Sequence, residues 1–117
     1  MIGALDASIS GLRAFQKKLD VTANNIANVN SDEFKKGRAV LSEGENGGVR
    51  VQIDQVNTPG HPRETVANGE VVETESSNVD LAEELTETIP TKAGYNANLK
   101  MIRQEDEMLG ALLDIVG

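Results

Sequence analysis

The chain has 117 residues, a formal net charge of −8 and no cysteine. This length corresponds to one domain, and the lack of cysteine excludes disulfides, thiolate metal sites and a cysteine nucleophile. The acidic balance disfavours nonspecific binding to nucleic acid or to an anionic membrane.

Residues 5–28 are predicted to form a long amphipathic helix. Apolar residues recur there at alternating four- and three-residue steps, a pattern typical of a helix that packs against another helix. This first seam consists of Leu5, Ile9, Leu12, Leu19, Ala23 and Ile26. A second set of small residues would let another helix approach closely: Ala4, Ala7, Gly11 and Ala14. The helix is predicted to end near residues 28–30, because asparagine and serine side chains there compete for backbone hydrogen bonds.

Residues 31–77 are predicted to be a connector of short strands and turns. Its strand signals are an extended piece that begins at Phe34, the alternation of Val49, Val51 and Ile53, and the segment 70–74. Its turn signals are the glycine-rich residues 43–48, Pro59-Gly60 and Asn68-Gly69. We expect one small hairpin or a three-stranded patch, which is too small to be a domain.

Residues 78–117 are predicted to form the second long helix. Asn78 is a suitable N-cap, and acidic residues follow it in the first turns, where the positive end of the helix dipole favours them. The second seam consists of Leu81, Leu85, Tyr95, Leu99, Ile102, Leu109, Leu113 and Val116. Pro90 removes a backbone hydrogen bond from the helix interior. The sequence therefore predicts a kink or break at residues 87–91.

Together these elements predict a mainly α fold with a small β region. The helices within residues 1–30 and 78–117 are expected to pack as an antiparallel helical hairpin or coiled coil, with a short β-hairpin patch between them. Such a chain buries little apolar surface alone, so we expect the two seams to complete their packing against other copies.

The charge is unevenly distributed along the chain. Residues 1–41 carry a net charge of +2 and residues 42–117 a net charge of −10. Opposite charges favour association of the two ends, within or between copies. The alternative interpretation is that both charged faces are solvated and that the imbalance arises by chance.

The side chains that perform catalysis or bind metals form no recognisable constellation. The single histidine, His61, lies between Gly60 and Pro62 in a predicted turn. Glu83 and Glu87 lie one helical turn apart and could contact a cation, although a solvated helix face is the simpler interpretation. No glycine-rich phosphate loop or nucleophile elbow is present. We therefore expect no enzyme, no metal, no cofactor and no small-molecule substrate.

Targeting signals are equally sparse. No apolar run reaches the roughly eighteen residues that a membrane span needs. Residues 1–15 lack the basic region and the continuous apolar region of a cleavable secretory signal. We expect no membrane span and no cleaved signal, so export would use another route.

Two stretches are more specific than any periodicity. The first reads Ala-Asn-Asn-Ile-Ala-Asn-Val-Asn-Ser-Asp-Glu-Phe-Lys over residues 23–35. The second comprises Asn-Val-Asp-Leu at 78–81, Tyr-Asn-Ala-Asn at 95–98 and Asp-Glu-Met-Leu at 106–109. Both closely resemble the terminal signatures of the bacterial flagellar rod and hook family, in the right order and at the right ends. The signature residues are Asn24, Asn25, Ile26, Ala27, Asn28 and Phe34, followed by Asn78, Val79, Asp80, Tyr95, Ala97 and Asn98.

The resemblance implies an axial structural protein. In that family both terminal helices line the inner tube of the flagellar axis, protomers stack helically around a channel, and subunits leave through the flagellar type III export apparatus without a cleaved signal. The implied partners are other copies, other rod and hook subunits and the export apparatus. The implied location is the basal-body rod that spans the periplasm, with a role in motility. The short middle resembles rod members more than hook members, which carry large outer domains.

The alternative function is a small acidic coiled-coil adaptor or export chaperone in the cytoplasm.

Three departures from the family pattern lie where the helices would pack on their neighbours. Glu33 replaces the family's turn glycine, Lys92-Ala93-Gly94 replaces Gln-Arg-Ala before the tyrosine, and Pro90 precedes that segment. The asparagines of the first signature could bond backbone groups at the helix end or adjacent protomers; ordinary polarity at a helix end is the other interpretation.

Overall fold

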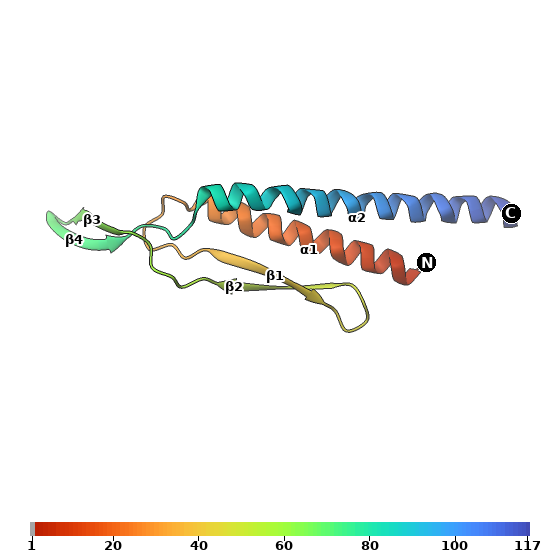
Figure 1. The fold of residues 1–117 in the computed structure, drawn as a ribbon, viewed down its shortest axis with the longest axis horizontal. Coiled ribbons are helices and arrows are strands. Elements are labelled where there is room, and N and C mark those ends of the chain that lie inside the picture. The colour runs from red at the N-terminus through yellow and green to blue at the C-terminus, as the bar shows by residue number, and fades with distance from the viewer. Residues whose placement is uncertain (1) are drawn as a thin grey trace.

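Two long helices run side by side in opposite directions in the computed structural model, which describes residues 2–117 (Figure 1). α1 spans Ile2–Ala27 and α2 spans Leu81–Val116. Both termini lie at the same end of the molecule, and α2 continues past the beginning of α1 (Figure 1). The mainly α fold and the antiparallel helical hairpin are therefore confirmed.

The small β region between the helices consists of two separate antiparallel hairpins. β1 (Gly37–Glu43) pairs with β2 (Val49–Gln55), and β3 (Pro62–Ala67) pairs with β4 (Glu70–Glu75). β1–β2 lies along α1, whereas β3–β4 projects beyond the ends of both helices (Figure 1). β3 was not predicted, because its polar residues carry no apolar alternation. The predicted Asn68-Gly69 turn joins β3 to β4, and its two residues have positive φ angles of 53° and 81°.

α1 is the central layer, with α2 on one side and β1–β2 on the other (Figure 1). Val49 and Val51 are half-buried, which confirms the predicted apolar face of this strand, whereas Ile53 at the end of the alternation is exposed. The Val49 N–H donates to the Ser10 hydroxyl at 3.0 Å and fixes the hairpin to the helix.

The molecule is elongated, with extents of 78 × 25 × 22 Å and a radius of gyration of 20.7 Å. A compact domain of 100 residues has a radius of gyration of about 13 Å. Among residues 3–117, Ala14 is the only buried hydrophobic residue. The chain thus buries little apolar surface by itself, as the organisation of its predicted elements indicated. In the same range, no helix combines the length and the apolarity needed to cross a bilayer.

Asp80 caps α2, so the predicted N-cap at Asn78 is wrong. The Asp80 carboxylate accepts hydrogen bonds from the backbone N–H groups of Ala82 at 3.0 Å and Glu83 at 3.2 Å. A capping side chain must lie two or three residues before these donors. Asp80 satisfies this condition, and the Asn78 amide instead bonds other segments of the chain.

α2 is one continuous helix through Pro90, so the chain does not break at residues 87–91, which was one of the two outcomes predicted there. Pro90 lacks the N–H that would bond the Thr86 carbonyl, but it is exposed and water can reach this region. The adjacent Thr91 is buried, and its hydroxyl donates to the Glu87 carbonyl at 2.8 Å. Tertiary packing on this side outweighs the local cost of the proline.

Glu33 makes the bend after α1 with a φ of 60°, in the left-handed region. The flagellar rod and hook signature has glycine at this position. Here the glutamate adopts the left-handed conformation, so the bend forms without glycine. The Glu33 N–H donates to the Glu75 carbonyl at 2.8 Å, which ties the bend to the end of β4.

Replacing Glu33 with glycine should raise the free energy of unfolding by about 1 kcal/mol, because a side chain in the left-handed region costs roughly 1–2 kcal/mol. Part of that gain is offset by the larger entropy of glycine in the unfolded chain. Urea unfolding measures the change. Asn68→Gly is the control, since Asn68 has a similar φ of 53° but asparagine tolerates this region. An equal gain at both positions would contradict strain at Glu33.

Candidate functional site

The two signature segments meet where α1 ends and α2 begins, and Asn25 lies at the centre of this junction. The Asn25 side chain is only 1% exposed. Its amide exchanges two hydrogen bonds with the backbone of Gly37: the Gly37 N–H donates to Oδ1 at 2.9 Å, and Nδ2 donates to the Gly37 carbonyl at 2.9 Å. Nδ2 also donates to Glu84 Oε1 at 3.2 Å. One buried amide therefore connects α1, β1 and α2.

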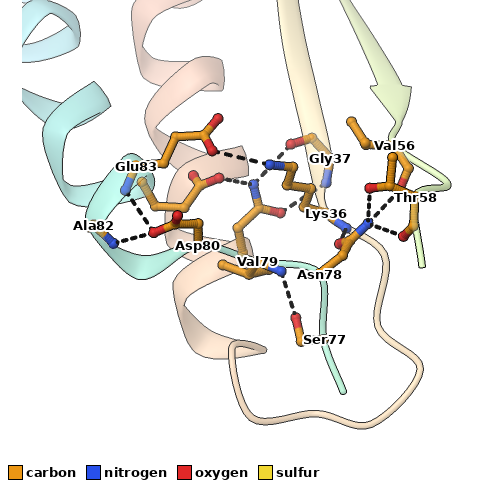
Figure 2. Close-up of polar contacts among 12 residues, drawn as sticks. Lys36, Gly37, Val56, Thr58, Ser77, Asn78, Val79, Asp80, Ala82 and Glu83 are labelled. Atoms are coloured by element: carbon orange, nitrogen blue, oxygen red, sulfur yellow. Dashed lines mark hydrogen bonds and ion pairs between the residues drawn. The ribbon is translucent and has the colours of Figure 1, made fainter. Parts of the chain in front are cut away.

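Asn78 has a similar role for the connector (Figure 2). Its Oδ1 accepts the Lys36 N–H at 2.7 Å, and its Nδ2 donates to the carbonyls of Val56 at 2.8 Å and Thr58 at 2.9 Å. The amide thus bonds the chain before β1 and the chain after β2 at once. Because backbone groups need partners when they leave a sheet, Asn78 satisfies three that the hairpin leaves open.

The other asparagines of the first signature have different environments. Asn28 Nδ2 donates to the Asn24 carbonyl at 2.9 Å, so this amide bonds a backbone group at the helix end, as expected. The Asn24 side chain is exposed. Of the three asparagines, only Asn25 bridges separate elements.

Ion pairs also join the basic first third of the chain to the acidic remainder. Lys18 Nζ lies 3.2 Å from Glu87 Oε2, Lys36 Nζ lies 3.4 Å from Glu83 Oε2, and Lys35 pairs with Glu75. The opposite charges thus associate within one chain. The partners of Glu83 and Glu87 are lysines, and such surface pairs contribute at most about 1 kcal/mol each.

Within residues 2–117 no cluster of three or more His, Cys, Asp or Glu side chains is arranged to hold a metal. His61 is exposed in the loop before β3. Its backbone N–H donates to the Ser76 hydroxyl at 3.0 Å. The bonds described at the junction are amide hydrogen bonds and ion pairs.

The contact between α1 and α2 is made by small and polar residues. Ala14 and Thr22 are buried on α1, and Thr91 is buried on α2. At Gly94, an added methyl carbon would lie 2.4 Å from the Phe15 ring, which shows how closely the helices approach. Gly94, one of the residues that depart from the family pattern, thus lies against Phe15 of α1. The small residues of α1 were the sequence signal for this contact; the buried Thr22 and Thr91 were missed.

The candidate subunit-packing residues flank this contact instead of filling it. Seven of these residues are half-buried: Leu5, Ile9, Leu12, Ile26, Tyr95, Ile102 and Leu109. The other five are exposed: Leu19, Leu81, Leu85, Leu99 and Leu113. α2 continues past α1 (Figure 1). In its last turns, Met108, Leu112, Leu113, Ile115 and Val116 are exposed on one side of the helix, across roughly 160° of its circumference at 100° per residue. Exposed apolar surface of this kind marks interaction sites in soluble proteins.

Comparison with known proteins agrees with the two-ended signature. Residues 73–115 match the family described as flagellar basal body rod FlgEFG protein C-terminal, and residues 5–35 match the family described as flagella basal body rod protein. The first match contains α2 and the second most of α1, and together they cover more than half of the chain. The chain belongs to the flagellar rod and hook family.

The individual relatives match over short stretches. The flagellar basal-body rod protein FlgG of Bacillus subtilis (strain 168) is 51% identical over 43 residues, which are 37% of this chain and 16% of that protein. The flagellar hook protein FlgE of Borreliella burgdorferi is 53% identical over 38 residues, 32% of this chain and 9% of the relative. The FlgE of Treponema pallidum is 45% identical over 38 residues, 32% of this chain and 8% of the relative. The matched part of this chain thus spans less than a fifth of each relative's length.

Proposed function

We propose that this chain is a structural, non-enzymatic subunit of the flagellar basal-body rod that polymerises helically through its terminal helices and forms part of the hollow drive shaft. Family membership supports an axial role. The observation that carries the proposal is that different residues of the two helices make the contact within the chain and the exposed surface. Small and polar residues make the contact within the chain. Large apolar residues such as Leu99 and Leu113, 41% and 70% exposed, remain available to neighbours.

The exposed apolar surface favours association with neighbouring copies. Burying one large aliphatic side chain completely contributes roughly 1.5–3 kcal/mol, and association costs about 4–15 kcal/mol in lost freedom of motion. The five exposed apolar residues of the last turns of α2 would offset much of that cost if neighbouring copies covered them. A helical polymer provides such a neighbour for every subunit.

The connector supports a position in the rod and not in the hook. Between the signature segments the structure has only two short hairpins, without an additional outer domain. Copies of the chain, other rod or hook subunits and the flagellar export apparatus are the proposed partners. The proposed location is the rod that spans the periplasm, which the chain would reach by export without a cleaved signal.

The acidic sequence, with a calculated pI of 4.6, keeps a second candidate open: a helical-hairpin adaptor or export chaperone. Cell fractionation separates the two functions. Recovery of the protein with purified basal bodies is the result expected of a rod subunit, and recovery only from the cytoplasm would support the adaptor.

Leu99→Asp should prevent incorporation into the rod and abolish motility. Leu99 is exposed enough for the isolated chain to tolerate aspartate, but an unpaired carboxylate in a subunit contact costs several kcal/mol. Ile102→Asp should act in the same way. Gln104→Asp is the matched control, because it adds the same charge at an exposed polar position. Export of the variants into the medium and their circular dichroism should be unchanged, and normal motility with Leu99→Asp would overturn the proposed seam.

A further inference from the structure

The β3–β4 hairpin presents an apolar and acidic face that no helix or other strand of the described residues covers. The strand register places Val66 opposite Val71 and Glu64 opposite Glu73. Directly opposed residues lie on the same face of a hairpin, and adjacent pairs alternate between faces. Residues two positions apart share a face, so Val66, Val71, Glu64 and Glu73 form one surface, named here the hairpin face.

The composition of the hairpin face lowers the stability of the hairpin in the isolated chain. Val66 and Val71 are 71% and 67% exposed, and β3–β4 packs against no other helix or strand of the described chain. Like charges placed directly opposite on two strands are destabilising, and a lone two-stranded hairpin is marginally stable. Glu64 and Glu73 have no ion-pair partner among residues 2–117. A basic and apolar partner would remove both penalties.

A groove with this character lies between α1 and β2. It has a volume of about 640 Å³, with Ile9, Val49 and Val51 as its large apolar residues. Arg13 and Lys17 also line it, and neither has an ion-pair partner within the described residues. Asp6 is its single acidic residue. These six residues define the α1–β2 groove, whose net charge is opposite to that of the hairpin face.

The spacings of the two surfaces also agree. Two residues along a strand advance about 6.6 Å, which separates the valine pair from the glutamate pair of the hairpin face. Four residues along a helix advance about 6 Å, which separates Ile9 from Arg13 and Arg13 from Lys17. A hairpin laid along α1 with its valines over Ile9 therefore brings its glutamates to Arg13.

We propose that the hairpin face of one copy docks into the α1–β2 groove of a neighbouring copy. The proposal deepens the proposed function and rests on it. The groove borders the first two thirds of α1, whereas β3–β4 projects beyond the opposite end of a molecule that is 78 Å long, so a chain does not reach its own groove (Figure 1). A stable interface buries roughly 800 Å² per partner; this contact is smaller and acts by repetition along a polymer.

Disulfide trapping tests the contact directly, because the cysteine-free chain gives each introduced thiol a unique identity. Full-length Val71→Cys is mixed with full-length Val49→Cys at high concentration under oxidising conditions, because Val49 lies beside Ser10 and Ile9. A disulfide requires the two Cα atoms to lie within about 7 Å, so a cross-linked pair of copies is the expected product. Val72→Cys is the matched control, since Val72 lies on the opposite face of the hairpin. Equal cross-linking from both positions, or none from Val71→Cys, would overturn the docking.

A charge exchange provides the second test. Glu64→Lys with Glu73→Lys in the hairpin copy should reduce the yield of the cross-link at least tenfold. Arg13→Glu with Lys17→Glu in the groove copy should restore it, because the two sets of charges then attract again. Failure of this exchange to restore the cross-link would contradict the proposed pairing.

The controls distinguish failure of the docking from failure of the proposed function. Sedimentation that shows only monomers at every concentration, together with absence from basal bodies, would remove both. Unchanged assembly with the reversed hairpin, while Leu99→Asp still prevents assembly, would remove the docking alone. Capture of another axial protein by Val71→Cys in cells, without capture of Val49→Cys, would show that the hairpin binds a different partner.

Discussion

Replacing Asn25 with alanine should lower the free energy of unfolding by roughly 3–5 kcal/mol. The substitution leaves the Gly37 N–H and carbonyl without partners and removes a hydrogen bond from the buried Glu84 carboxylate. An unsatisfied buried group costs about 1–3 kcal/mol, and more when it is charged. Domains are stable by only about 5–15 kcal/mol, so the variant should be close to unfolded at 37 °C.

Urea unfolding followed by circular dichroism measures this loss. Asn24→Ala is the matched control, because Asn24 is the same residue type, one position earlier and exposed; its effect should stay within about 0.5 kcal/mol. Asn25→Asp keeps the shape of the side chain but places a second carboxylate beside Glu84, so it should be at least as destabilising as alanine. A loss below about 1 kcal/mol in Asn25→Ala would show that the junction does not depend on this amide.

Gly94→Ala should destabilise the helical hairpin by about 1–3 kcal/mol, although alanine is the better helix former by up to about 1 kcal/mol. The new methyl carbon would lie 2.4 Å from the Phe15 ring, so the ring or the helix must move. Overpacking of this kind typically costs about 1–3 kcal/mol. The helix contact and the helix propensity thus act in opposite directions at this position, and we expect the contact to dominate.

Gly110→Ala separates the two effects. Gly110 lies in the same helix, and an added methyl carbon there would have no neighbour within 4 Å. This control should gain up to about 1 kcal/mol in thermal or urea unfolding. Combining Gly94→Ala with Phe15→Leu should recover part of the lost stability, because the smaller side chain vacates the contact. Stabilisation by Gly94→Ala alone would mean that the helices lie farther apart than described.

The junction explains in physical terms why signature residues from both ends of the sequence occur together. Asn25 and Asn78 bond backbone groups that no secondary structure satisfies, and Asp80 caps the helix that follows. These contacts hold α2 against α1 at one end of the molecule. The apolar residues further along both helices are thereby kept in a defined arrangement, which a polymer needs for a regular subunit contact.

The sequence by itself determined the two helices, one hairpin turn and the family. Heptad-like apolar spacing specified two long helices, Asn68-Gly69 specified a hairpin, and the paired signatures at residues 23–35 and 78–109 specified the family. These features are local or follow a fixed period, so they can be read from neighbouring residues. The opposite charges of the two ends also indicated that they associate, and the ion pairs Lys18–Glu87 and Lys36–Glu83 occur within one chain.

Only the tertiary structure decided which face of each helix the chain uses for itself. Thr22 and Thr91 are buried in the folded chain and Gly94 lies against the Phe15 ring, whereas Leu99 and Leu113 remain exposed. Pro90 stays within α2, and Glu33 adopts the left-handed conformation, because contacts from distant segments outweigh local preferences of about 1–3 kcal/mol. Close approach of two distant segments depends on their mutual fit, and neither segment encodes that fit alone.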